Sequence, residues 1–351
     1  MSIERTATVT PHPSQDGRVG VLDGWRAISI LAVLAGHWLP IGPKSLELNG
    51  AVAASGMAIF FTLSGYLITS LLLRDSRPLP FLIRRLLRIL PLAWAAMIVL
   101  AVANRADSAT IAANLLFYAN LPPAHLMSGG EPLWSLCIEV QFYLSIAAIV
   151  TVFGRRGLYL LPLLALAITG YRITAGVPIS IITWERVDEI LAGAILALVF
   201  ARRQAGWSLP RALTWAPIAL AALLLASAHP AFGPLAYLRP YIAAAAVGTS
   251  MLGTPAWFRA LLCLRPMRYI AEISYALYVI HGILSATWLG GHDASKADRY
   301  LRRPLLMLAT AALAHLSTFH FERHFIELGK RLTRRGALPP KWQPAKDLTT
   351  L

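Results

Sequence analysis

Apolar windows long enough to cross a membrane recur along this sequence and limit it to one class of fold. Ten of them follow one another, at residues 22–40, 51–73, 89–104, 133–153, 157–174, 185–201, 212–228, 237–255, 270–290 and 304–321. Backbone polar groups inside a bilayer must be satisfied internally, so such windows fold as helices. The composition agrees, because 57% of the residues are apolar and only 14% are charged. We therefore predict an all-α, polytopic membrane helical bundle of about ten transmembrane helices.

The basic residues are divided unevenly between the two sides of this predicted bundle. An even number of spans places both termini on one side, which receives 22 of the 32 Lys and Arg residues, against 9 on the other side and Arg26 within the first span. The positive-inside rule then predicts that both termini are cytoplasmic. The same asymmetry accounts for the net charge of +15, so we expect no nucleic-acid partner.

We divide the chain into three parts. Residues 1–20 form a polar cytoplasmic segment without the apolar core of a signal peptide, 21–325 form the membrane domain, and 326–351 form a basic cytoplasmic tail. Within the long outside connection at 105–132, residues 109–121 have helical spacing. Whether they re-enter the membrane is left open.

Two ionisable side chains in the first window share one helix face. Arg26 and His37 are eleven residues apart, which is roughly three turns plus about 20°, and about 16 Å along the axis. Charges within membrane helices normally face a protein interior or a water-filled cavity. We expect this face to line a cavity. Taken singly, Arg26 could instead anchor the helix at the headgroups and His37 could be a packing residue.

A cluster of arginines opens the third window on the cytoplasmic side. It consists of Arg84, Arg85 and Arg88, of which the last two share a helix face. Guanidinium groups at a helix N-terminus form a good phosphate site. The pattern equally suits anchoring among anionic lipid headgroups. In the second window, Ser64 and Gly65 would allow close approach of another helix or of a ligand.

Glu139 lies about two turns inside the outer end of the fourth window, at a depth similar to that of His37. An imidazole and a carboxylate at one depth can act as an acid–base pair. The alternative is a structural hydrogen bond from Glu139 to another helix.

Weaker candidates lie towards the outer side. Arg186 and Asp188 are as consistent with an internal ion pair as with acceptor binding. His281 is a second polar residue that could line the cavity, whereas Tyr275 and Tyr278 are better explained as core residues. His315, His320 and Glu322 lack the spacing of metal ligands, so no metal is expected.

Taken together, these stretches resemble the acyltransferase-3 family of integral-membrane O-acyltransferases. The likeness lies, in order from about residue 20 to 325, in LDGWRAISILAVLAGH, FFTLSGYL, RRLLRILP, LWSLCIEVQFYL, ERVDEILAG and ISYALYVIH. The last family motif, Glu-x-Pro, is not kept, since Glu322 is followed by Arg323 and His324. No role is therefore carried over to Glu322.

The resemblance implies an acyl-CoA donor, most simply acetyl-CoA, as a co-substrate with no bound cofactor. It implies a sugar or other hydroxyl acceptor, such as a bacterial cell-surface glycan or a lipid-linked glycan, and a multi-pass protein of a bacterial inner membrane. The chain ends soon after the last window, so we expect no appended extracytoplasmic domain of the kind that some relatives carry.

The resemblance also implies that Arg26 and His37 are essential and that the arginine cluster serves the donor. We assign His37 as the general base and Glu139 as the group that orients or charges it. The remaining expected donor-site residues are Arg84, Arg85, Arg88, Ser64 and Tyr66. The acceptor-side candidates are Arg186, Asp188, His281 and Trp134.

The expected mechanism has the donor held at the cytoplasmic face, with its arm extending past Arg26 to His37. It predicts a pore-like cavity from the arginine cluster to His37, with the acceptor entering from the outside. A transporter or flippase is the main alternative, because it would share the charges at the membrane midplane. A non-enzymatic scaffold would leave the alignment of Arg26 and His37 unexplained.

Overall fold

The computed structural model describes residues 15–202, 210–291 and 295–334, and all the regular secondary structure in these ranges is helical. The α-helices are α1 (Gln15–Trp38), α2 (Leu48–Arg74), α3 (Pro78–Asn104), α4 (Ser108–Leu115), α5 (Trp134–Phe153), α6 (Leu161–Thr174), α7 (Asp188–Arg202), α8 (Ala216–Ser227), α9 (Arg239–Leu252), α10 (Ala256–Leu262), α11 (Arg265–Ser285), α12 (Lys296–Leu316) and α13 (Arg323–Arg334). The prediction of an all-α protein is confirmed for this part of the chain.

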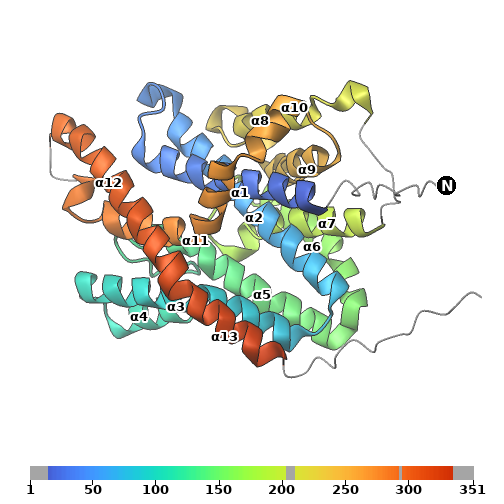
Figure 1. Cartoon of the computed structure of the whole chain (residues 1–351), viewed down its shortest axis with the longest axis horizontal. Helices are drawn as coiled ribbons and strands as arrows, with labels where there is room; N and C mark the ends of the chain where they lie inside the picture. Colours follow the sequence, from blue (N-terminus) through green and yellow to red (C-terminus); the bar gives the residue numbers. More distant parts are fainter. Residues whose placement is uncertain (1–14, 203–209, 292–294, 335–351) are drawn as a thin grey trace, which may run out of the picture.

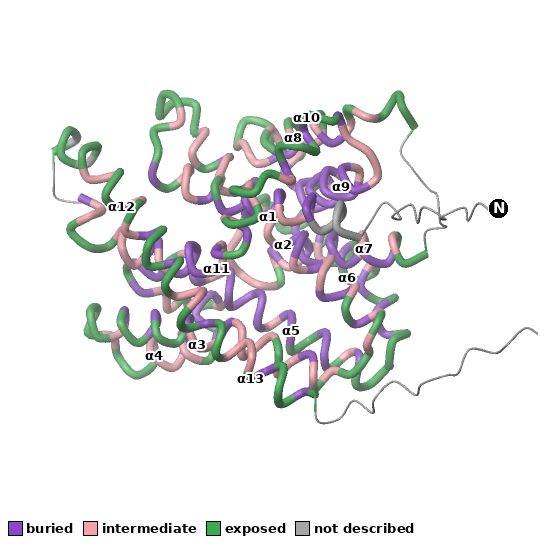
Figure 2. The backbone as a smooth tube through the Cα atoms, in the orientation of Figure 1, coloured by how far each residue is buried: buried purple, intermediate pink, exposed green. Residues whose placement is uncertain are grey.

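Helix α2 forms the centre of the bundle. It packs against α1, α7 and α9, and buried residues occur on every side of it, as expected of a helix that is apolar all round. Figure 2 shows buried residues concentrated in the inner helices, whereas α12 at the edge is largely exposed. In Figure 1, α12 and α13 run as one long ribbon across the bundle.

Two glycines let α2 and α7 approach closely. A Cβ atom built on Gly65 would lie 1.8 Å from the carbonyl oxygen of Ile190, and one on Gly193 would lie 2.0 Å from that of Thr62. Both positions therefore exclude any larger residue unless the backbones separate. This confirms the prediction that the small residue at position 65 admits a neighbouring helix.

Four helical segments are long and apolar enough to cross a membrane: Leu48–Arg74, Pro78–Asn104, Glu131–Thr174 and Tyr300–Arg334. The third joins two predicted windows, because a 3₁₀ segment, Gly154–Leu160, connects α5 to α6 directly. Other windows coincide with shorter helices: α8 and α9 have 12 and 14 residues, roughly 18 and 21 Å, against about 30 Å of hydrocarbon. The structure supports a helical membrane protein. The count of ten spans and the side of the termini stay predictions.

Several predicted boundaries are corrected. Helix α3 begins at Pro78, so Arg84 to Arg88 lie about two to three turns inside it and do not open it. Helix α1 begins at Gln15, within the predicted N-terminal segment. The predicted tail at 326–351 begins inside α13, and 335–351 lie outside the described residues, as do 1–14.

The helical spacing expected at 109–121 corresponds to α4. Its start is fixed by Asp107, whose side chain accepts a hydrogen bond from the backbone N–H of Thr110 at 2.7 Å. Only the first half of the stretch is α-helical, since α4 ends at Leu115.

Candidate active site

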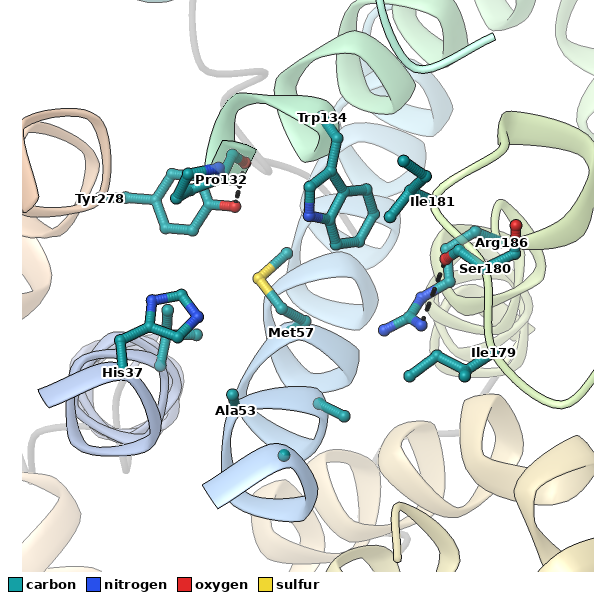
Figure 3. Close-up of a pocket in the computed structure, with 13 residues that line it drawn as sticks. His37, Ala53, Met57, Pro132, Trp134, Ile179, Ser180, Ile181, Arg186 and Tyr278 are labelled. Atoms are coloured by element: carbon teal, nitrogen blue, oxygen red, sulfur yellow. Dashed lines mark hydrogen bonds between the residues drawn. The ribbon is translucent and has the colours of Figure 1, made fainter. Parts of the chain in front are cut away.

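His37 lines a cavity of about 370 Å³, which we call the His37 cavity. His37 comes from the last turn of α1, Met57 from α2, Trp134 from the start of α5 and Tyr278 from α11. Figure 3 shows His37 on one side, Arg186 on the other, and Met57 between them. The guanidinium of Arg186 lies over the ring of Trp134, 5.4 Å from its centroid. The structure thus brings a histidine, an arginine and a tryptophan from the predicted set to one cavity.

The hydrogen-bonding partner of His37 is His281. Nδ1 of His37 lies 3.0 Å from Nε2 of His281, and the two rings stack with centroids 5.2 Å apart and 18° between their planes. His37 is exposed, whereas His281 is buried. His281 was predicted as a second polar lining residue, and it lies behind His37 instead.

Glu139 has other partners than the one predicted. Its Oε1 accepts hydrogen bonds from Ser64 Oγ at 2.6 Å and from the hydroxyl of Tyr143 at 2.5 Å. The predicted contact between Glu139 and His37 is corrected accordingly. The alternative predicted from the sequence was a structural hydrogen bond from Glu139 to another helix. The bond between Glu139 of α5 and Ser64 of α2 fits that alternative.

Glu139 and Ser64 belong to a second, narrow space of about 60 Å³, the arginine cavity. Three guanidinium side chains line it, and all three are half-buried: Arg26, Arg85 and Arg88. Within the residues that the structure describes, none of the three makes a hydrogen bond or an ion pair with the protein. Their acidic electrostatic neighbours are Asp23 and Glu139 for Arg26, and Glu139 and Glu322 for Arg88.

A third cavity, of about 420 Å³, continues from the arginine cavity and shares Arg26 and Arg88 with it. We call it the Asp23 cavity. Its other charged residues are Asp23, Arg268, Glu272, Glu322 and Arg323. Glu322 belongs to a short π-helical segment, Ser317–Glu322, and accepts hydrogen bonds from Ser317 and Thr318 at 3.0 and 3.2 Å. Such segments are frequent at functional sites.

The arginine cavity and the His37 cavity lie on either side of two stacked rings. Phe60 lines the first and Tyr278 the second, with ring centroids 6.1 Å apart and planes within 8° of parallel. The structure therefore shows successive cavities, where a continuous pore was predicted.

A separate group of charges is buried beside the His37 cavity. Arg172 pairs with Asp188, while Glu189 pairs with Arg186 at 3.1 Å and with Arg239 at 2.8 Å. Each of these side chains is at most 2% exposed. Asp188 therefore forms the internal ion pair that was one of its two interpretations, and it does not line the cavity. Arg186 does both.

Two predicted donor residues lie away from the arginine cavity. Arg84 donates its Nε–H to Thr333 Oγ1 of α13 at 2.6 Å, and Tyr66 packs edge-on against Phe200 with ring centroids 6.0 Å apart. Neither residue lines any of the three cavities. Of the predicted donor residues, Arg85, Arg88 and Ser64 line the arginine cavity.

Tyr278 belongs to the buried core and Tyr275 packs against it, as the sequence predicted, but the lining of the cavities by tyrosines was not predicted. Tyr278 lines the His37 cavity, and Tyr143 and Tyr275 line the arginine cavity. Helical spacing could have found them, because Tyr143 follows Glu139 by four residues and Tyr275, Tyr278 and His281 follow one another by three.

Comparison with known proteins gives a consistent result. A family model described as an acyltransferase domain matches residues 19–320. Peptidoglycan O-acetyltransferase OatA of Listeria monocytogenes is 28% identical over 310 residues, which cover 74% of this chain and 48% of that protein. The putative peptidoglycan O-acetyltransferase YrhL of Bacillus subtilis is 29% identical over 325 residues, covering 77% and 49%.

Nodulation protein 10 of Rhizobium leguminosarum bv. viciae is 25% identical over 159 residues, covering 37% of this chain and 42% of that protein. The chain spans about half the length of the two peptidoglycan relatives. No solved structure matches it. Because the family model covers most of the sequence and the motifs of the resemblance fall within it, the chain belongs to the acyltransferase-3 family.

Proposed function

We propose that this protein transfers an acyl group, most simply acetyl, from acyl-CoA to a hydroxyl of a cell-envelope glycan, with His37 as the general base. The proposal rests on the placement of two neighbouring cavities and the side chains that line them. Three arginines that make no hydrogen bond or ion pair within the described part of the chain line one cavity, and an exposed imidazole lines another cavity just beyond Phe60 and Tyr278. The first can hold an anionic donor and the second can activate a hydroxyl.

The donor assignment rests on charge. Removing a guanidinium from water is costly unless an anion compensates it. Arg26, Arg85 and Arg88 face one carboxylate, Glu139, in their cavity. Phosphate groups match the forked donors of arginine. Asp23 and Glu322 offset part of the charge of Arg26 and Arg88 without forming an ion pair with them. A phosphorylated donor would supply forked hydrogen-bond acceptors together with further negative charge.

The cavity sizes favour a donor with a bulky end and a thin arm. The Asp23 cavity, at about 420 Å³, has room for the bulky end. The arginine cavity, at about 60 Å³, has the space of only a few water molecules. Coenzyme A has this shape, since a nucleotide carries its thioester on an extended chain.

In the proposed reaction, the acceptor O–H gives its proton to Nε2 of His37 while the acceptor oxygen bonds to the thioester carbon. The carbon–sulfur bond then breaks, and the departing thiolate takes the proton from the imidazolium. His37 returns to its neutral form. The transfer from a thioester to an oxygen ester needs no additional energy source.

The acceptor class rests on the cavity lining and the relatives. Trp134 offers an aromatic face, and Arg186 offers N–H donors to sugar oxygens. Two relatives are named as peptidoglycan O-acetyltransferases, one of them putatively. Both facts support a glycan acceptor in the bacterial envelope.

The experiment is thioester consumption by the purified protein with a glycan acceptor. We expect His37→Ala to lower turnover by about 10²–10⁴-fold, the usual contribution of a general base, with donor affinity unchanged. His315→Ala is the control, because His315 is exposed on α12 and contacts Tyr269. Wild-type turnover in a well-folded His37→Ala protein would reject the proposal. Absence of thioester consumption by the wild-type protein would favour the transporter alternative.

A further inference from the structure

His281 has a hydrogen-bonding pattern that defines its protonation. Its Nδ1 lies 2.5 Å from the backbone carbonyl oxygen of Tyr278, on the preceding turn of α11. A carbonyl oxygen can only accept, so Nδ1 of His281 carries the proton. In the neutral ring, Nε2 of His281 then has a free lone pair and can only accept.

That lone pair fixes the tautomer of His37. Because Nε2 of His281 accepts, Nδ1 of His37, 3.0 Å away, must be the donor. The proton of neutral His37 therefore sits on Nδ1, and its Nε2 is the basic nitrogen. With Nδ1 engaged by His281, Nε2 is the ring nitrogen left to act in the cavity that His37 lines.

We infer that His281 is a positioning residue, which holds His37 in the tautomer and orientation that leave Nε2 free to receive the proton of the acceptor hydroxyl. This inference rests on the proposed function. It gives His281 the role that a buried carboxylate has in other histidine-based sites, where the group behind the imidazole selects which nitrogen is basic.

The surroundings hold the His281 ring in place. It is 1% exposed, and the ring of Trp38 packs edge-on against it, with centroids 6.0 Å apart. Trp38 also donates its Nε1–H to Ser285 Oγ at 2.8 Å, and Ser285 donates to the carbonyl of His281 at 2.6 Å. The end of α1 is thereby fastened to α11 beside the two imidazoles.

Tyr278, whose backbone carbonyl accepts the hydrogen bond from Nδ1–H of His281, is itself held in place through its hydroxyl. It donates to the carbonyl of Pro132 at 2.5 Å and accepts from Ser135 at 2.8 Å. The start of α5 therefore supports the same turn of α11. The His281 ring is therefore held by contacts from α1 and by a turn of α11 that α5 supports, and these contacts favour a single tautomer of the ring.

During transfer, His281 keeps its own proton. The proton of the acceptor hydroxyl moves to Nε2 of His37, which becomes an imidazolium with Nδ1–H still donated to Nε2 of His281. When the thiolate takes the proton from Nε2, the starting tautomer is restored without any movement of protons between the two histidines.

Two substitutions separate this role from packing. His281→Gln supplies a side-chain carbonyl that can accept from Nδ1 of His37, whereas His281→Leu fills the space without an acceptor. We expect His281→Leu to lower kcat by between about tenfold and 10⁴-fold, the range for losing a partner that fixes an imidazole tautomer or ligand. We expect KM for acetyl-CoA to stay unchanged and His281→Gln to regain most of the lost kcat. Ser285→Ala is the structural control on the next turn of α11. It removes the bond from Trp38 and the bond to the carbonyl of His281, and it leaves the two contacts that define the tautomers, His281 to Tyr278 and His37 to His281, in place.

A spectroscopic measurement tests the tautomer directly, in the wild-type protein. With ¹⁵N-labelled histidine, the signals of His37 are identified by their loss in His37→Ala. We expect protonated Nδ1 and unprotonated Nε2 in the wild type and in Ser285→Ala, and the reverse tautomer or a mixture in His281→Leu.

The outcomes separate this inference from the proposed function. A wild-type His37 protonated on Nε2 would overturn the inference, as would unchanged kcat in His281→Leu or equal losses in His281→Leu and His281→Gln. In each of these cases, an inactive His37→Ala protein would leave the proposed function intact. An active His37→Ala protein would reject both.

Discussion

At the scale of single residues, the arginines inside the bundle form two groups, those paired with a carboxylate of the protein and those that are not. Arg172, Arg186 and Arg239 are neutralised by Asp188 and Glu189, so the protein itself compensates their burial. Arg26, Arg85 and Arg88 meet in one cavity without a protein hydrogen bond or ion pair in the described part of the chain. The first group holds helices together, and the second is available for a ligand.

Arg88 and Arg84 make a matched pair for testing this division, because they lie on the same helix four residues apart. Arg88 lines the arginine and Asp23 cavities, whereas Arg84 is bonded to Thr333. We expect Arg88→Ala to weaken acetyl-CoA binding about ten- to a hundredfold, the loss of a charge-assisted hydrogen bond worth roughly 1.5–3 kcal/mol. Arg84→Ala should bind normally. Calorimetric titration of the purified variants measures both affinities.

Equal weakening by the two substitutions would contradict the division, since it would indicate a diffuse effect of positive charge. Unchanged affinity in Arg88→Ala, together with a lower yield of membrane-inserted protein, would support the alternative that these arginines anchor the helix among anionic lipids.

Helical periodicity within one helix gave sound residue-scale predictions, whereas the particular partner predicted for Glu139 on another helix was wrong. Helical periodicity placed Arg26 and His37 on one face of α1, and both line cavities. The partner of Glu139 could not be read in the same way, because equal depth in the membrane does not say which helices are neighbours. Helix α11, carrying His281, packs beside α1, so His281 contacts His37.

At the scale of elements, the contact between α2 and α7 depends on having no side chain at two positions. Gly65→Ala would place a methyl group against the carbonyl of Ile190, which is backbone and cannot rotate away. We expect destabilisation of roughly 1–3 kcal/mol, as for other overpacked sites. The measurement is the thermal unfolding midpoint in detergent.

Gly170→Ala is the matched control, since nothing lies within 4 Å of a Cβ built at that position of α6. It should unfold at or above the wild-type temperature, because alanine favours a helix over glycine by about 0.5–1 kcal/mol. An unfolding temperature for Gly65→Ala equal to that of Gly170→Ala would show that α2 and α7 are not in close contact in the membrane.

The boundaries of elements were less predictable than their existence. Hydropathy locates the apolar part of a helix, whereas its ends are set by hydrogen bonds and by proline. Helix α3 starts at Pro78, in the first turn where proline is tolerated, and so extends well beyond the apolar window that begins at 89. The polar α13 has no apolar window of its own, yet it packs on α3 through Gly329 and Thr333. Because no apolar window marks α13, residues 326–351 were predicted to form a basic cytoplasmic tail.

At the scale of the whole molecule, the cavities lie towards opposite ends of the same two helices. The Asp23 cavity uses residues near the starts of α1 and α11, Asp23 and Arg268, whereas the His37 cavity uses residues near their ends, His37 and Tyr278. The predicted topology places the starts of both helices in the cytoplasm. A donor held at Arg26 and Arg88 would then face an acceptor that reaches His37 from the opposite side.

This arrangement predicts transfer across the membrane. In inside-out vesicles that contain a glycan acceptor, acetyl-CoA added outside should meet the Asp23 cavity, and acetylated acceptor should form in the lumen. The acyl arm must pass the stacked rings of Phe60 and Tyr278 to reach His37, so transfer requires both rings to leave a gap for a thin chain. His37→Ala vesicles are the control for acceptor leakage and for enzymes other than this one. Labelling only of acceptor supplied on the same side as acetyl-CoA would contradict this prediction. It would show that the chemistry takes place at one face, and that the Asp23 and His37 cavities do not serve the two substrates from opposite sides.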